Sequence, residues 1–201
     1  PWHALEDNLR KMLKSGMKVT VAEQEDQLRE GAKLLERVVT RVYTPGSLYE
    51  ESLLSTDERS LLAAIVLSKD QLGMGVIDAS TGESWASTWS GDDKFNHAMD
   101  EILRWNPAEI VISSKDSEDS TLCTMFTHLQ DTVISQHNAS ENKRRNRLME
   151  ILKVADLGHL DLDDAPLSLA AAGLAADYLA TVHIADSIPI RDISIIEEKG
   201  H

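Results

Sequence analysis

The chain has few of the residues that would tie it to a secreted or metal-stabilised class of protein. It contains a single cysteine, Cys123, in 201 residues, so no disulfide can form within it. No Cys/His spacing typical of zinc ligands is present either, and the sequence gives no basis for a metal site. The scarcity of cysteine favours a reducing compartment.

Long apolar runs are also missing. No run approaches the roughly 20 residues that a helix needs to span a bilayer. The first residues, PWHALEDNLR, lack the basic start and the apolar centre of a signal peptide. We therefore expect a soluble, cytoplasmic protein with no membrane partner. A first residue of proline instead of methionine further indicates a piece of something longer.

Basic residues are outnumbered by acidic ones, 20 to 34, which gives a net charge of −14. This balance argues against non-specific nucleic-acid binding by the chain as a whole, because such binding rests on Lys and Arg neutralising phosphates. The charge is uneven, since residues 1–57 hold eight basic and ten acidic residues and almost all the excess lies downstream. We expect DNA, if it is bound, to contact the first segment and a protein partner to contact the rest.

Residues 37–48, RVVTRVYTPGSL, divide the chain into a shorter N-terminal segment and a longer C-terminal segment. Before them, helical and alternating spacings predict a helix over about 3–14 that stops at Gly16, a strand over 18–22 and a helix over 25–36. A strand over 37–43 then meets Thr44-Pro45-Gly46-Ser47, which is typical of a type II turn. Because this core is too small for a complete domain, we expect further strands upstream. We interpret Pro45-Gly46 as a hinge between two unequal pieces.

The second piece follows an acidic linker over 48–60 and predicts an α/β fold. Three strands, 61–68, 72–79 and 83–89, are separated by short turns and form a meander. Helices and strands then alternate: helix 92–105, strand 109–112, helix 117–129, strand 132–135, helix 141–154 and helix 166–183. The order βββαβαβα is that of an RNase H-like domain. The short β-rich tail after residue 183 indicates the beginning of a further domain.

An RNase H-like fold raises the alternative of a metal-dependent nuclease, in which carboxylates hold two divalent ions. The carboxylates to test are Asp78, Glu101 and Asp131. The first strand is wholly apolar, however, and Asp78 precedes Ala-Ser-Thr-Gly, where an aspartate most often caps its own turn. No phosphate-cradling glycine motif and no Ser/His/Asp arrangement appears. On its residues alone the chain reads as non-catalytic, with no cofactor and no metal.

The strongest local positive charge lies in the predicted helix over 141–154. Its basic residues are Lys143, Arg144, Arg145 and Arg147. No aromatic residue lies nearby to stack on a base, and we interpret the cluster as a solvated helix face.

Five stretches, in order, resemble the MutS family of DNA mismatch repair proteins and cover essentially the whole chain. They are PWHALEDNLRKMLKSGMKVTVAEQ, ERVVTRVYTPGSLYEESLLSTDERSLLAAI, LGMGVIDASTGE, ILRWNPAEIVI and APLSLAAAGLAADYL. One departure is Gln27, which stands where the family usually has a proline after Glu-Asp.

The resemblance implies a domain plan. Residues 1–47 would be the C-terminal part of a mixed α/β mismatch-binding domain, 48–60 a linker, 61–185 an RNase H-like connector domain and 186–201 the start of a lever or core domain. The DNA wedge element, the clamp and the ATPase domain, with its ATP and magnesium, would lie outside the chain, which would therefore be no enzyme by itself. Mispaired DNA is easier to deform than paired DNA, which a wedge exploits.

The same resemblance makes Arg37 and Arg41 candidate phosphate contacts. They are four residues apart on the strand before the turn, so we expect both to project from one face. The alternative, which the sequence favours equally, is that they are surface arginines that pair with Glu36 or Glu50.

The function implied is that of a fragment. In full length it would be a homodimer that binds mispaired double-stranded DNA and couples ATP to recruitment of a MutL-like partner through the connector. A metal-dependent nuclease and a stand-alone protein-interaction module remain the alternatives.

Overall fold

The computed structural model describes residues 2–24, 35, 37–48, 60–157, 166–182 and 190–196, with the side chains of 2–5 and 166 left out. Most of the predicted helix over 25–36 and of the predicted linker over 48–60 lies outside the described residues.

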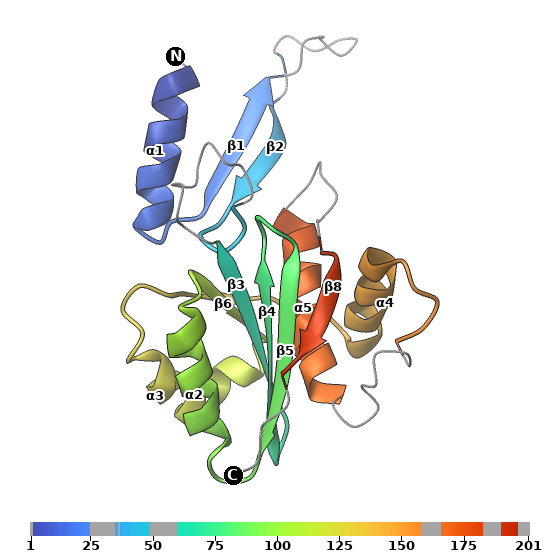
Figure 1. The fold of residues 1–201 in the computed structure, drawn as a ribbon. Helices are drawn as coiled ribbons and strands as arrows, with labels where there is room; N and C mark the ends of the chain where they lie inside the picture. Colours follow the sequence, from blue (N-terminus) through green and yellow to red (C-terminus); the bar gives the residue numbers. More distant parts are fainter. Residues whose placement is uncertain are drawn as a thin grey trace.

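The N-terminal unit, residues 2–48, is a helix beside a two-stranded ribbon (Figure 1). Helix α1 (Trp2–Lys14) is followed by strands β1 (Val19–Gln24) and β2 (Arg37–Tyr43), which pair antiparallel. Its small core contains Leu9, Leu13, Tyr43 and Leu48. The two leucines are four residues apart and so share one face of α1, which is the face that packs on the ribbon.

The sheet domain, residues 60–196, is built on six strands in the order β7-β6-β3-β4-β5-β8. The strands are β3 (Leu61–Leu67), β4 (Gln71–Asp78), β5 (Glu83–Ser90), β6 (Glu109–Ile112), β7 (Val133–Gln136) and β8 (Asp192–Ile195). The pairs β3-β4 and β4-β5 are antiparallel, which confirms the predicted meander, while β6, β7 and β8 pair parallel to their neighbours. Strand β8 comes from the tail, and it extends this sheet at the β5 edge.

Helices cover both faces of this sheet (Figure 1). They are α2 (Lys94–Trp105), α3 (Ser120–Phe126), α4 (Glu141–Leu152) and α5 (Pro166–Val182), with a 3₁₀ turn, η1 (Asp116–Glu118), before α3. The predicted helix over 117–129 is therefore divided. The side chain of Asp119 accepts a hydrogen bond from the backbone N–H of Leu122 at 2.8 Å, and this N-cap starts α3 as a new helix.

Strand β3 lies at the centre of the three layers. Leu61, Ala63 and Ile65 pack toward α2 and α3, whereas Leu62, Ala64 and Val66 pack toward α5. A strand buried on both faces reads as a continuous apolar run, which is why LLAAIVL shows no alternation.

Helix α5 lies very close to the sheet and to α4. A β-carbon added to Gly75 on β4 would lie 2.5 Å from the backbone nitrogen of Ala172, and one added to Gly173 would lie 2.8 Å from the carbonyl oxygen of Arg144. These distances are too short for any side chain. The small residues along α5 therefore hold α4 and the sheet at backbone contact.

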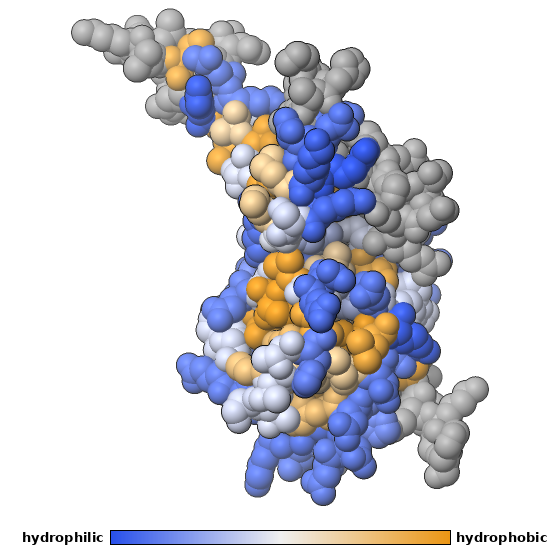
Figure 2. All heavy atoms as spheres, turned by 90° about the vertical axis from the view of Figure 1, so that its left-hand side faces the viewer, coloured by the Kyte–Doolittle hydropathy of each residue, from blue (hydrophilic) through white to orange (hydrophobic). Residues whose placement is uncertain are grey.

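The face that carries α2 and α3 mixes hydrophobic and hydrophilic surface, with hydrophobic atoms gathered near its middle (Figure 2). Leu103 of α2 is the most exposed large hydrophobic residue recorded in the described part of the chain, at 59%. None of the described helices combines the length and the apolar character needed to cross a membrane.

Candidate functional site at the junction of the two units

The turn over Thr44 to Ser47 is a buried part of the contact between the two units. The backbone N–H of Ser47 donates to the carbonyl of Thr44 at 3.1 Å, which closes the turn. A type II turn needs a positive φ at its third residue. Gly46 is not among the described glycines with positive φ, so the type II prediction is wrong.

Gly46 is required at this place for space instead of backbone freedom. A β-carbon here would lie 2.8 Å from the β-carbon of Glu109 and 2.9 Å from Cδ1 of Leu62. The open position lets the backbone N–H of Gly46 donate to Glu109 Oε2 at 3.1 Å. The turn therefore docks directly on the first residue of β6.

Ser60, just before β3, fixes the other side of the turn. Its hydroxyl accepts a hydrogen bond from the N–H of Leu48 at 3.0 Å and donates to the carbonyl of Pro45 at 3.1 Å. Residues 43–48 are all buried. The segment that we interpreted as a hinge is thus anchored to the sheet domain on both sides.

Glu109 is a fully buried carboxylate at the centre of this junction. Its Oε1 accepts hydrogen bonds from the hydroxyl of Tyr178 at 2.6 Å and from the hydroxyl of Ser135. The ammonium of Lys18 lies 3.5 Å from the same oxygen. Two strands, one helix and the N-terminal unit therefore converge on one side chain.

Lys18 reaches the site from the segment just before β1. Gly16, which ends α1 with a φ of +79°, lies against Val133 of β7, and this contact brings the following residues over the sheet domain. The Lys18 ammonium also donates to the hydroxyl of Tyr178 at 2.9 Å and lies 5.2 Å from the centre of its ring. With 43% of its side chain exposed, Lys18 sits at the rim of the junction while Glu109 sits inside.

Tyr178 serves this site as a neutral donor. Its burial, together with the negative charge of Glu109, raises the pKa of the phenol well above its usual range. The phenol therefore keeps its proton at neutral pH and donates it to the carboxylate.

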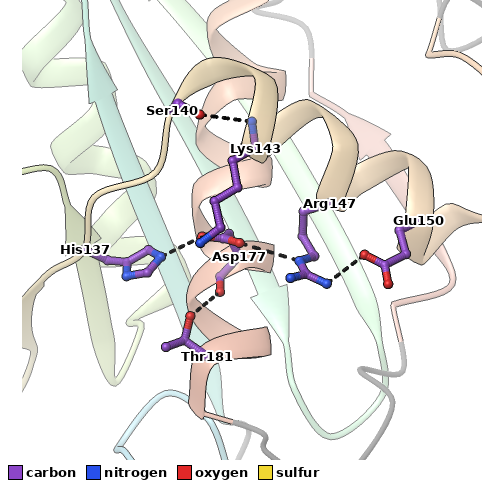
Figure 3. A network of polar contacts seen from close by, with 7 residues as sticks. All are labelled: His137, Ser140, Lys143, Arg147, Glu150, Asp177 and Thr181. Atoms are coloured by element: carbon purple, nitrogen blue, oxygen red, sulfur yellow. Dashed lines mark hydrogen bonds and ion pairs between the residues drawn. The ribbon is translucent and has the colours of Figure 1, made fainter.

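A second buried carboxylate, Asp177, precedes Tyr178 on α5 and forms ion pairs with basic side chains of α4 (Figure 3). Its Oδ2 lies 2.8 Å from His137 Nε2 and 2.8 Å from the ammonium of Lys143. The Nε of Arg147 lies 3.5 Å from Oδ1, and the same guanidinium pairs with Glu150 at 2.7 Å. Burial raises the pKa of Asp177, but the hydrogen bonds and charges of Lys143 and His137 outweigh it and leave the pKa below its usual value.

From the sequence we interpreted the basic face of this helix as solvated. In the structure it is only partly solvated. Lys143 and Arg147 turn inward to Asp177, whereas Arg145 is exposed. The rings of His137 and Tyr178 meet edge to face with their centres 5.6 Å apart. This contact and the adjacency of Asp177 and Tyr178 make the two buried carboxylate sites neighbours.

The carboxylates of the nuclease alternative serve other purposes. Asp78 accepts hydrogen bonds from the N–H groups of Ser80 at 2.9 Å and Thr81 at 3.3 Å, which confirms the turn-capping interpretation. Glu101 accepts from Arg104 at 2.5 Å and from Trp105 at 2.9 Å. Asp131 is exposed. In the described part of the chain, no group of three or more His, Cys, Asp or Glu side chains is arranged to hold a metal ion.

The two predicted DNA contacts, Arg37 and Arg41, are exposed on β2 but do not share a face. Opposite them on β1 stand Gln24 and Val21, and the pairing register skips Thr40, which forms a bulge. Residues opposite each other point to the same side, and Val21 and Gln24 are three positions apart, so Arg37 and Arg41 project to opposite sides. Arg41 donates to the hydroxyl of Tyr43 at 3.2 Å. The bulge is why the expectation of one shared face was wrong.

Glu109 and Asp177 were both missed as site residues by sequence reasoning, although each leaves a signal. Glu109 is the one charged residue in the buried strand EIVI. Asp177 is the one charged residue in the helix PLSLAAAGLAADYLATV. A lone charge inside an apolar element implies a buried partner, since an unpaired buried charge is strongly unfavourable.

Comparison with known proteins gives consistent matches to both units. The family model described as MutS domain II matches residues 60–189, and that of MutS domain I matches residues 1–52. The DNA mismatch repair protein MutS of Symbiobacterium thermophilum is 30% identical over 185 residues, which is 91% of this chain and 21% of the relative. MutS of Anaeromyxobacter sp. (strain K) is 33% identical over 183 residues, which is 90% of this chain and 20% of the relative. The chain thus spans about a fifth of the length of the curated relatives that it matches.

Proposed function

Because this chain belongs to the MutS family of DNA mismatch repair proteins, we propose that it supports the DNA-reading part of a mismatch-recognition protein and joins that part to the rest of the molecule. The N-terminal unit corresponds to the matched domain I and the sheet domain to the matched domain II. In this proposal the chain passes a displacement of its DNA-reading part to the rest of the molecule and has no catalytic role of its own.

The observation that carries the proposal is the buried junction between the two units. A flexible tether would leave the turn over residues 44–47 solvated, whereas here it packs on Glu109 and Ser60 through backbone hydrogen bonds. A firmly seated junction can pass a displacement of one unit to the other, which a mismatch sensor requires of the segment behind its DNA-reading surface.

In the full-length protein, the N-terminal unit faces DNA. Arg41 and Arg37 are its candidate phosphate contacts, and the bulge at Thr40 directs them to different sides of the ribbon. We therefore assign the duplex contact to one of them, and Arg41 is the first to test.

The remaining roles belong to the full-length protein. We propose that the sheet domain is a connector through which a MutL-like partner is recruited, and that the protein is a cytoplasmic homodimer. ATP and magnesium would be bound by the part of the relatives' length that this chain does not span.

The complete protein that contains this chain tests the proposal. Its affinity should be higher for a duplex with one mispair than for the matched duplex, and a MutL-like partner should be retained in the presence of ATP and mispaired DNA. Equal affinity for both duplexes would contradict the DNA-reading role. Retention of the partner without DNA would favour the interaction-module alternative.

A further inference from the structure

Glu109 is buried in one unit and obtains its cation from the other. Ser135 and Tyr178 of the sheet domain give it neutral hydroxyl groups only. Among the described residues, the cation recorded against it is Lys18 of the N-terminal unit. We propose that Glu109 is the docking receptor for the N-terminal unit and that its ion pair with Lys18 is a latch that opens when the two units separate.

The sheet domain by itself does not satisfy this carboxylate. A buried carboxylate requires charge compensation as well as hydrogen bonds, and two hydroxyl donors supply no charge. The N-terminal unit completes the site with the N–H of Gly46 on Oε2 and the ammonium of Lys18 on the side of Oε1. Both oxygens of Glu109 therefore bind the N-terminal unit, so the carboxylate defines its position.

The two partners are unequal, and this makes the contact a latch. The Lys18 side chain is 43% exposed and keeps access to water. Breaking the ion pair therefore costs the ammonium little free energy, because water solvates it. Glu109 is fully buried, so the loss of its cation is unfavourable until water reaches it. An intermediate in which Glu109 has lost Lys18 but is still shielded from water is thus the state of highest free energy. The two units should therefore dock or separate in a single step.

The experiment measures hydrogen exchange of single backbone amides in the 201-residue chain by NMR, with the Gly46 amide as reporter because it donates to Glu109. In Lys18→Met, its exchange should rise about tenfold, as expected for local opening after loss of an ion-pair partner. The amide of Ile65 in the central strand should change less than about twofold. Lys11→Met, on the exposed side of α1, is the matched control and should leave both amides unchanged.

Two further variants separate the latch from general packing. Lys18→Arg restores the charge and should return the Gly46 amide to near wild-type exchange. Glu109→Gln should raise its exchange, and adding Lys18→Met to Glu109→Gln should have a smaller effect than Lys18→Met has in the wild type, the remainder coming from the contact of Lys18 with Tyr178. If the two effects multiply instead, or if Lys18→Met leaves the Gly46 amide unchanged, the latch is ruled out. Should Glu109→Gln not fold, Lys18→Met and Lys18→Arg still decide.

The consequence for DNA rests on the proposed function and is measured apart from it. In the full-length protein, Lys18→Met should lower the affinity for a mispaired duplex relative to the matched duplex several-fold, and Lys11→Met should not. A wild-type protein that does not distinguish the duplexes would overturn the proposed function while the exchange results still decide the latch. A Lys18→Met protein with unchanged discrimination would overturn the positioning role alone.

Discussion

Gly46 lies so close to Glu109 that a β-carbon added to the glycine would come within 2.8 Å of the β-carbon of the glutamate. The contact joins a turn of the N-terminal unit to the first residue of β6, and the Gly46 N–H donates to the carboxylate at 3.1 Å. Pro45-Gly46 therefore marks a place where two units are pressed together. This relationship leads to a direct test by substitution.

Gly46→Ala should destabilise the chain. The new methyl group would meet the β-carbon of Glu109 and Cδ1 of Leu62, both of which are fixed in strands, so the turn must move away and weaken its hydrogen bond. Overpacking of this kind costs about 1–3 kcal/mol. The measurement is the free energy of unfolding in urea. Lys115→Ala, at an exposed loop position, is the control and should remain within about 0.5 kcal/mol of the wild type.

Asp177 should make the stability depend on acid pH. Its pKa is lower in the folded chain than in the unfolded chain, where a carboxyl of this type titrates near about 3.9. The stabilisation is thus complete above that pH and is lost as the pH falls through the folded value. Urea unfolding of the wild type between about pH 6 and pH 2 should show a steeper loss below about pH 4 than Asp177→Asn. Equal slopes for the two proteins would contradict the assignment.

Asp78 should behave as a turn residue and not as a metal ligand. Asp78→Ala removes the acceptor of the Ser80 and Thr81 backbone N–H groups and should cost about 1–3 kcal/mol. Asp78→Asn keeps an oxygen in the same place and should lose less.

Magnesium distinguishes this role from the nuclease alternative. A metal ligand would make millimolar Mg²⁺ raise the Tm of the wild type but not of Asp78→Asn, because an ion that binds only the folded state stabilises it. We expect no difference between the two proteins in their response to Mg²⁺.

Arg41→Ala in the full-length protein should weaken binding to mispaired and matched duplexes alike. A phosphate contact carries no sequence information, and its removal should also make the dependence of affinity on salt less steep, with a slope smaller by about one. Arg37→Ala is the matched comparison, since it removes the same charge from the opposite side of β2. An unchanged salt slope in Arg41→Ala would rule out this contact.

Much of the fold could be predicted because its signals are local. Strands β2 and β6 have the predicted bounds, and the strand predicted over 61–68 is β3, which ends one residue earlier. Asp78 before a tight turn was predicted to cap that turn, and it does. Each of these features depends on neighbours within a few residues, for which spacing and residue type are sufficient evidence.

Other features were missed because they depend on a single geometric detail. The cap formed by Asp119 divides a predicted helix, and the bulge at Thr40 reverses the side to which one arginine points. An aspartate inside a helical pattern and a threonine inside a strand are both common. Neither residue type by itself indicates a new helix start or a β-bulge at that position.

The order of most of the described elements, the division at residues 44–47 and the family to which the chain belongs could be read from the sequence alone. The nature of that division depends on contacts that exist only in the folded chain. Lys18, Gly46, Glu109 and Tyr178 are separated by up to 160 residues, as in the hydrogen bond from Lys18 to Tyr178. Periodicity describes one element at a time and does not report which elements meet. A buried carboxylate acquires its role from the groups that the fold brings to it, and here half of them come from the other unit.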